Sequence, residues 1–169
     1  GAVVALAYLG DPVRPDAKTS ISALRQAGWS VRILSGDATP VVRAVGRSLG
    51  LAPDECQGEA TPEEKLRVVE SLKLDHRVVM VGDGVNDAAA IAAATVGIGV
   101  HGGAEASLAT ADIFLTKPGL APLVELMQGA GNTMRVIRRN ITFSLLYNVV
   151  GASLAIVGLI NPVIAAVMM

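Results

Sequence analysis

Short apolar runs alternate with longer amphipathic or small-residue stretches along most of the chain. The apolar runs are typical of strands buried on both faces of a parallel sheet, and the longer stretches are typical of helices. Strands are predicted at residues 2–9, 30–34, 77–81, 95–100 and 112–115. Helices are predicted at residues 16–27 and 87–94. Two further helices are predicted from their start signals: one has Thr39 as cap and Pro40 at its first position, and the other begins with the capping box Thr61-Pro62-Glu64. This alternation predicts an α/β fold with a doubly wound parallel sheet.

The pattern changes toward the C-terminus, where an amphipathic stretch from about residue 120 to 139 leads into an uncharged run without a helix stop. All 14 basic and 15 acidic residues precede Ile141. Residues 141–160 are roughly 20 uncharged residues, enough to cross a bilayer as one helix. Three arginines just before the run favour a cytoplasmic N-terminal side: Arg135, Arg138 and Arg139. A helix enclosed in a soluble core is the alternative.

These patterns predict four parts: an α/β domain at residues 1–118, a stalk helix at 119–140, a transmembrane helix at 141–160, and a turn with the start of a second spanning helix at 161–169. The run after Pro162 is too short to span a membrane, and Gly1 is no initiator residue, so we expect a segment of a longer protein. The net charge of −1 and the lack of a larger basic cluster argue against a nucleic-acid partner. The single cysteine, Cys56, argues against a disulfide framework, and its polar surroundings predict a loop residue.

Two carboxylates follow the third predicted strand, in the segment Gly82-Asp83-Gly84-Val85-Asn86-Asp87. Ligands of open α/β sheets bind at the carboxyl ends of strands. Asp83 and Asp87 offer hard oxygen ligands for Mg²⁺, while Gly82 and Gly84 allow a sharp turn and a close approach to a ligand. The alternative is an ordinary turn whose acids are solvated or cap the next helix.

Two further loops follow predicted strands and carry groups suited to phosphate. One contains Asp11, and the other is Ser35-Gly36-Asp37. Lys65, on the capped helix, could neutralise the charge that develops during phosphoryl transfer. Each feature alone also fits an ordinary turn or a solvated lysine, but their order along the chain favours one phosphate site.

The motifs D-P-V-R-P, S-G-D, T-P-E-E-K and G-D-G-V-N-D, followed by Tyr147-Asn148, resemble the C-terminal part of the heavy-metal-transporting P-type ATPases over nearly the whole chain. The resemblance implies a haloacid-dehalogenase-like (Rossmann-like) domain, ATP as substrate and Mg²⁺ as cofactor. It also implies roles for individual residues. They are Asp83 and Asp87 at the Mg²⁺ site, Asn86 and Lys65 as phosphate contacts, Ser35-Gly36-Asp37 in dephosphorylation, and Asp11 in the hinge.

In the membrane part, Tyr147-Asn148 resembles the pair of copper-transporting members, and Met169 falls where those pumps carry a methionine. A thioether suits Cu(I), although Met168 and Met169 also fit lipid-facing or packing positions. The resemblance therefore implies a Cu(I) pump of a bacterial inner membrane whose α/β domain is cytoplasmic. Its partners would be lipid, a copper chaperone, and the actuator, nucleotide-binding and remaining membrane parts of the same polypeptide.

Some positions depart from the family pattern. Ala89 and Thr95 stand where the family commonly has proline and aspartate, and no Asp-Lys-Thr-Gly-Thr segment is present to accept a phosphoryl group. The chain alone is therefore expected to be inactive. Two alternatives stay open: a membrane-anchored phosphatase with Asp11 as nucleophile, which Val13 disfavours because a second acid is usual there, and a non-catalytic domain that binds nucleotide or a partner protein.

Overall fold

The structure is a computed structural model that describes residues 13–100, 109–158, 161 and 163. It divides into two compact units, Gly1–Val124 and Glu125–Met169. The predicted first strand and two candidate site residues, Asp11 and Met169, lie outside the described residues.

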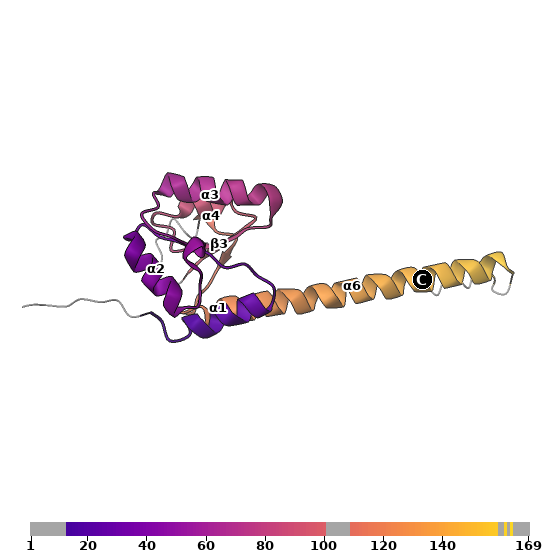
Figure 1. Cartoon of the computed structure of the whole chain (residues 1–169). Helices are drawn as coiled ribbons and strands as arrows, with labels where there is room; N and C mark the ends of the chain where they lie inside the picture. The colour runs from indigo at the N-terminus through magenta and orange to yellow at the C-terminus, as the bar shows by residue number, and fades with distance from the viewer. Residues whose placement is uncertain (1–12, 101–108, 159–160, 162, 164–169) are drawn as a thin grey trace, which may run out of the picture. The chain divides into compact units, whose positions relative to one another are not determined.

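Helices and short strands alternate in the first unit (Figure 1), as the sequence predicts. In chain order they are α1 (Ala17–Gln26), β1 (Ile33–Leu34), α2 (Thr39–Ser48), the 3-10 helix η1 (Pro53–Glu55), β2 (Cys56–Gln57), α3 (Pro62–Asp75), β3 (Val79–Gly82), α4 (Ala88–Ala93), β4 (Val96–Gly99) and β5 (Ile113–Phe114). The helices match their predicted ranges within a few residues, and β1 is shorter than its predicted range of residues 30–34.

Every strand pair in the described residues is parallel. β1 pairs with β2, with Ile33 opposite Cys56, while β4 lies between β3 and β5. The parallel α/β architecture is thereby confirmed. The described strands form two separate sheets, one of two strands and one of three, and a single sheet that includes residues 2–9 stays a prediction.

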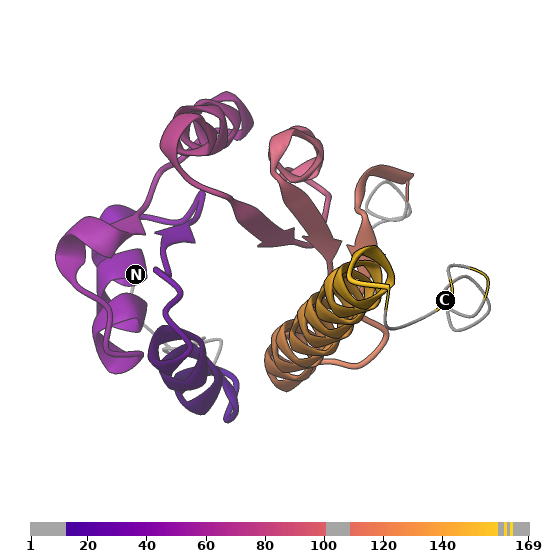
Figure 2. The same ribbon diagram turned by 90° about the vertical axis from the view of Figure 1, so that its right-hand side faces the viewer.

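Two apolar clusters hold these elements together. One joins α1, α2 and β2 through buried residues that include Ile21, Val42 and Cys56. The other joins α3, β3 and α4 through Val69, Met80 and Ile91. Figures 1 and 2 show α3 and α4 on one side of strands β3 and β4 and α1 on the other. This packing fixes the carboxyl end of β3, where the candidate site lies.

Two sequence predictions about this unit are wrong. Cys56 is not a loop residue: it lies in β2, is 5% exposed, and packs so closely on Gly46 of α2 that a Cβ there would overlap its Sγ. Burial raises the pKa of the Cys56 thiol. Thr39 is not the cap of α2 but its first residue, because its hydroxyl donates to Glu59 (2.7 Å) instead of bonding the α2 backbone.

The last helix, α6 (Ala121–Ile156), begins in the first unit and continues without a break into the second unit as far as Ile156. The predicted continuity of the amphipathic stretch with the uncharged run is thereby confirmed up to Ile156. Among the helices that the structure describes, none combines the length and the apolar character needed to cross a membrane. The predicted transmembrane helix at residues 141–160 is therefore not confirmed, and its last two residues lie outside the described part of the chain.

Candidate functional site

The loop after β3 carries an exposed carboxylate in a tight turn. Asp83 is exposed, and its Oδ1 accepts a hydrogen bond from the Val85 N–H (3.1 Å). Gly84 has a φ of 76°, a left-handed conformation that glycine adopts without steric cost. A Cβ on Gly82 would lie only 2.7 Å from Asp87 Oδ2. Gly82 and Gly84 are therefore both needed for this turn. Asn86 lies exposed in the same loop.

A largely buried ion pair joins this loop to α3. Lys65 Nζ donates to Asp87 Oδ1 at 2.6 Å, and the two side chains are 9% and 15% exposed. Asp87 occupies the N-cap position of α4, yet its side chain makes no capping hydrogen bond. The alternative in which Asp87 merely caps a helix is thereby excluded, because its carboxylate faces the lysine instead.

The position of Lys65 follows from local sequence. The predicted capping box is confirmed: Thr61 Oγ1 accepts from the Glu64 N–H (3.2 Å), and Glu64 Oε2 accepts from the Thr61 N–H (2.9 Å). This reciprocal cap fixes where α3 begins. Lys65 lies in the first turn, so the cap also decides which side of α3 the lysine occupies.

The Ser35-Gly36-Asp37 loop, after β1, is tied to the same helix start. Ser35 Oγ donates to Asp37 Oδ2 (2.7 Å) and accepts from the Asp37 N–H (3.2 Å). The Ala60 N–H donates to the Ser35 carbonyl (2.9 Å), one residue before the cap of α3. This backbone bond connects the hydroxyl loop, through the start of α3, to Lys65 and Asp87.

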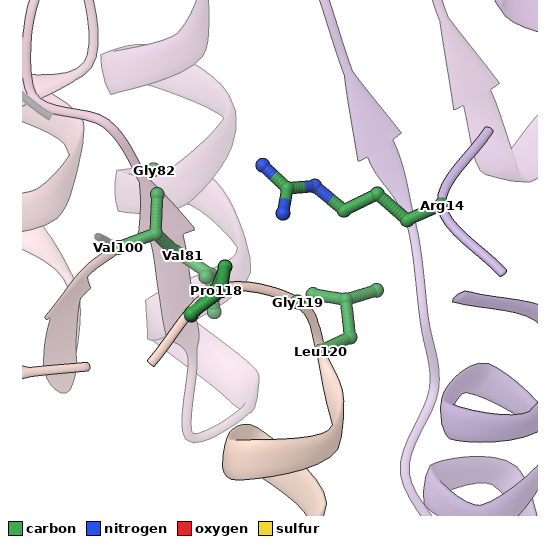
Figure 3. A pocket seen from close by; sticks show the side chains of 7 residues that line it. All are labelled: Arg14, Val81, Gly82, Val100, Pro118, Gly119 and Leu120. Atoms are coloured by element: carbon green, nitrogen blue, oxygen red, sulfur yellow. The ribbon is translucent and has the colours of Figure 1, made fainter. Parts of the chain in front are cut away.

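A cavity of about 240 Å³ opens beside the end of β3. It is lined by Val81 and Gly82, by Val100 after β4, by the loop of residues 118–120, and by Arg14. Arg14 reaches in from the segment before α1 and extends its guanidinium toward Gly82 (Figure 3). The cavity is therefore a space at the carboxyl ends of β3 and β4 with a cation at its wall, which suits an anionic group.

The donors at this site fit Mg²⁺ by their chemistry, since they are oxygens only, and Mg²⁺ commonly takes one or two carboxylates with phosphate oxygens and water. Within the described residues, no group of three or more histidines, cysteines or acids could hold a metal ion. Asp83 is exposed and so accessible to an ion from solution, whereas the Asp87 side chain is 15% exposed and pairs with the Lys65 cation. A Mg²⁺-ligand role thus fits Asp83 better than Asp87, and both roles stay predictions.

The remaining predicted residues lie elsewhere. Tyr147 is 43% exposed and Asn148 is half-buried on α6, in the second unit. Sequence reasoning assigned no role to Arg14, although it belongs to the D-P-V-R-P motif. It also missed Glu59, whose N–H donates to the Asp37 carbonyl (2.7 Å) from a left-handed conformation (φ 55°). Only the neighbouring Gly58 hints at that turn.

Comparisons with known proteins agree with the parallel α/β fold. A family profile described as haloacid dehalogenase-like hydrolase matches residues 2–95. The probable copper-importing P-type ATPase A of Enterococcus hirae is 35% identical over 164 residues, 96% of this chain and 23% of that protein. The manganese-exporting P-type ATPase of Mycobacterium leprae is 39% identical over 171 residues, 99% of this chain and 23% of that protein.

A solved structure, a zinc-transporting PIB-type ATPase in the E2·Pi state, superposes with a TM-score of 0.86 at 36% identity, covering 93% of this chain and 26% of that one. The chain thus spans about a quarter of the length of these relatives, which are named for three different metals: copper, manganese and zinc. The chain is thus similar over nearly its whole length to one part of heavy-metal P-type ATPases. The parallel α/β fold and the family profile lead to one conclusion: the chain belongs to the haloacid dehalogenase-like hydrolase family.

Proposed function

We propose that this chain is the later part of the phosphorylation domain, with the stalk and first following membrane helix, of an ATP-driven heavy-metal pump. One observation carries the proposal: the loop at the carboxyl end of β3 carries the exposed Asp83 and, four residues later, Asp87, which forms a largely buried ion pair with Lys65. A fixed cation beside a strand-end carboxylate is the arrangement that phosphoryl transfer needs, because the reaction is catalysed mainly by positioning and charge stabilisation.

In the proposed cycle an aspartate from outside this chain attacks the γ-phosphoryl group of ATP, so that the bond to ADP breaks and an aspartyl phosphate forms. Lys65 offsets the negative charge on the phosphoryl oxygens, and Asn86 contacts them. Ser35 and Asp37 then orient the water that hydrolyses the aspartyl phosphate. Asp83 would hold Mg²⁺, which neutralises phosphate charge when bound.

The membrane part of the proposal rests on α6. Residues 141–160 carry no charge, and several large apolar side chains along them are more than half exposed, among them Phe143 (63%) and Leu145 (61%). The hydroxyls of Thr142 and Ser153 donate to backbone carbonyls one turn earlier (2.9 and 2.8 Å), so these polar groups are satisfied within the helix. A helix with these properties suits a lipid environment, and we propose that it crosses the membrane with the phosphorylation domain in the cytoplasm.

We further propose Cu(I) as the transported ion, with a bacterial inner membrane as the location. Tyr147 and Asn148 would contribute to the metal site, because polar groups in a membrane segment are usually functional. Met169 would add a soft thioether ligand of the kind Cu(I) prefers. The partners would be lipid, a copper chaperone and the remaining parts of the same polypeptide.

The test is phosphoenzyme formation by the intact pump, measured with γ-labelled ATP and Mg²⁺ in the presence of Cu(I), Zn²⁺ or Mn²⁺. We expect Cu(I)-dependent labelling that Asp83→Ala abolishes. The matched control is Asp75→Ala, at an exposed carboxylate at the end of α3, which should label normally.

Normal labelling of the Asp83→Ala protein would refute the site assignment. Labelling that responds to Zn²⁺ or Mn²⁺ but not to Cu(I) would refute the copper assignment and leave the ATPase proposal intact.

A further inference from the structure

Asp16 joins two elements that are far apart in the sequence. Its Oδ2 accepts hydrogen bonds from the Leu120 N–H (2.6 Å) and the Ala121 N–H (2.9 Å), across 104 and 105 residues. Ala121 is the first residue of α6, so these donors belong to the backbone N–H groups that a helix start leaves without intrahelical partners. A carboxylate is the strongest common acceptor for such groups and also interacts favourably with the helix dipole.

Asp16 serves α6 instead of its own helix. It occupies the N-cap position of α1, but its side chain makes no capping hydrogen bond there. The Asp16 carboxylate approaches the backbone of Gly119 closely: Gly119 has a φ of 95°, and a Cβ on it would lie 2.5 Å from Asp16 Oδ2. The two hydrogen bonds therefore require a residue without a side chain at position 119.

Apolar packing fixes the same junction. Leu120 packs against the buried cluster that contains Ala17 and Ile21 of α1, and Leu123 is 6% exposed. The first turn of α6 is thus attached to the start of α1 by a charged contact and by apolar contacts.

The loop that Asp16 holds also reaches the candidate site. Residues 118–120 line the cavity beside Gly82, the residue before Asp83 (Figure 3). Arg14, which extends into that cavity, is two residues before Asp16. One short loop, which Asp16 holds, therefore lines the cavity at the end of β3 and leads directly into the first turn of α6.

We propose that Asp16 is a positioning residue that couples the state of the phosphorylation site to the stalk helix, by holding the start of α6 to the loop at the site. This proposal rests on the proposed function. Asp16 touches no substrate: it acts through Gly119, Leu120 and Ala121. Loss of the Asp16 carboxylate should leave the chemistry of phosphorylation in place, but it should weaken the transmission of structural change from the phosphorylation site to α6.

The test uses Asp16→Ala, Asp16→Glu and Gly119→Ala in the intact pump, with phosphoenzyme level and metal ions transported per ATP hydrolysed measured on the same preparations. For Asp16→Ala we expect a phosphoenzyme level within about twofold of the unmodified protein and a transport ratio lower by on the order of tenfold, the usual size of coupling between sites. Asp16→Glu should restore part of the ratio. Gly119→Ala should lower it as Asp16→Ala does, because the added methyl group displaces the same contact, and it keeps the proposal testable if Asp16→Ala does not fold.

An unchanged transport ratio in both Asp16→Ala and Gly119→Ala would overturn the proposal. Equal loss of phosphoenzyme and transport in all three variants would overturn it as well, because that result indicates general structural damage. Absence of phosphoenzyme in the unmodified protein would refute the proposed function itself, which distinguishes the two failures.

Discussion

Lys65 is the one charged residue among those described that is buried, at 7% exposure. Burial of a charge is costly unless a partner compensates it, and the partner here is Asp87 at 2.6 Å. Asp16 is a second charged residue with specific partners. Hydrogen bonds from the Ala121 and Leu120 backbone N–H groups hold the pKa of its carboxyl below the usual value, so the carboxyl stays ionised to lower pH. Single side chains thus carry both the candidate chemistry and the link to α6.

We predict that Lys65→Met lowers the free energy of unfolding of the chain by about 3 kcal/mol, because it leaves the carboxylate of Asp87 with no cation in a largely buried position. The double variant Lys65→Met/Asp87→Asn should lose much less than the sum of the two single variants. Urea denaturation of the three proteins measures this coupling.

Lys18→Met, at an exposed lysine of α1, is the control and should change the stability by less than about 0.5 kcal/mol. Strictly additive losses at Lys65 and Asp87 would mean that the ion pair contributes nothing to the fold.

The sequence predicted the residue types of the site better than their contacts. Lys65, Asp83 and Asp87 were recognised from local motifs, but the motifs did not indicate that Asp87 would bond Lys65, because the two are 22 residues apart. The role of Asp16 was missed for the same reason. Local patterns specify turns and helix starts, whereas contacts over long sequence separations depend on how the elements pack.

Among the elements, those with strong local signals were predicted best. The capping box of α3 was predicted residue for residue, since its hydrogen bonds lie within four residues. η1 and β2 were missed, because β2 is only two residues long and its neighbours are polar. Its position is set by pairing with β1 and by packing on Gly46, which a short sequence window does not contain.

The contact between α2 and β2 gives a prediction at this scale. Gly46→Ala should lower the free energy of unfolding by roughly 1–3 kcal/mol, because a Cβ there overlaps the buried Cys56 Sγ and the helix must move away from β2. Thermal and urea denaturation of the full chain measure the loss.

Gly129→Ala is the matched control, since Gly129 is also helical but has no atom within 4 Å of an added Cβ. There the substitution should leave stability unchanged or raise it by up to about 1 kcal/mol through helix propensity. If both variants behave alike, the packing of α2 on β2 is looser than described.

On the scale of the whole molecule, the proposed membrane location of the chain depends on α6. Its later part carries large apolar side chains of which roughly half the surface is exposed, such as Ile141 (56%) and Val150 (48%). An apolar surface of this kind marks contact with lipid or protein. The sequence predicted the continuous helix correctly, because uninterrupted periodicity is a local property, but what surrounds the helix depends on contacts that a local pattern does not contain.

We predict that the full chain associates with lipid vesicles and that Val150→Lys, near the middle of the proposed span, strongly reduces the fraction that resists alkaline extraction. A charge at the centre of a membrane helix costs on the order of 2.5–3.5 kcal/mol. Vesicle flotation followed by extraction provides the measurement.

Asn132→Lys, on an exposed part of α6 before the proposed span, should leave extraction unchanged. Equal behaviour of the two variants would count against the membrane assignment.

The contact between Asp16 and the start of α6 also has a consequence for biosynthesis. Its two sides are separated by 104 residues, and every described strand lies between them. At about 5–20 residues per second, Leu120 is added roughly 5–20 seconds after Asp16. The carboxylate of Asp16 therefore has no partner at α6 until all these strands have been translated, and this contact is among the last long-range contacts that the first unit can form during synthesis.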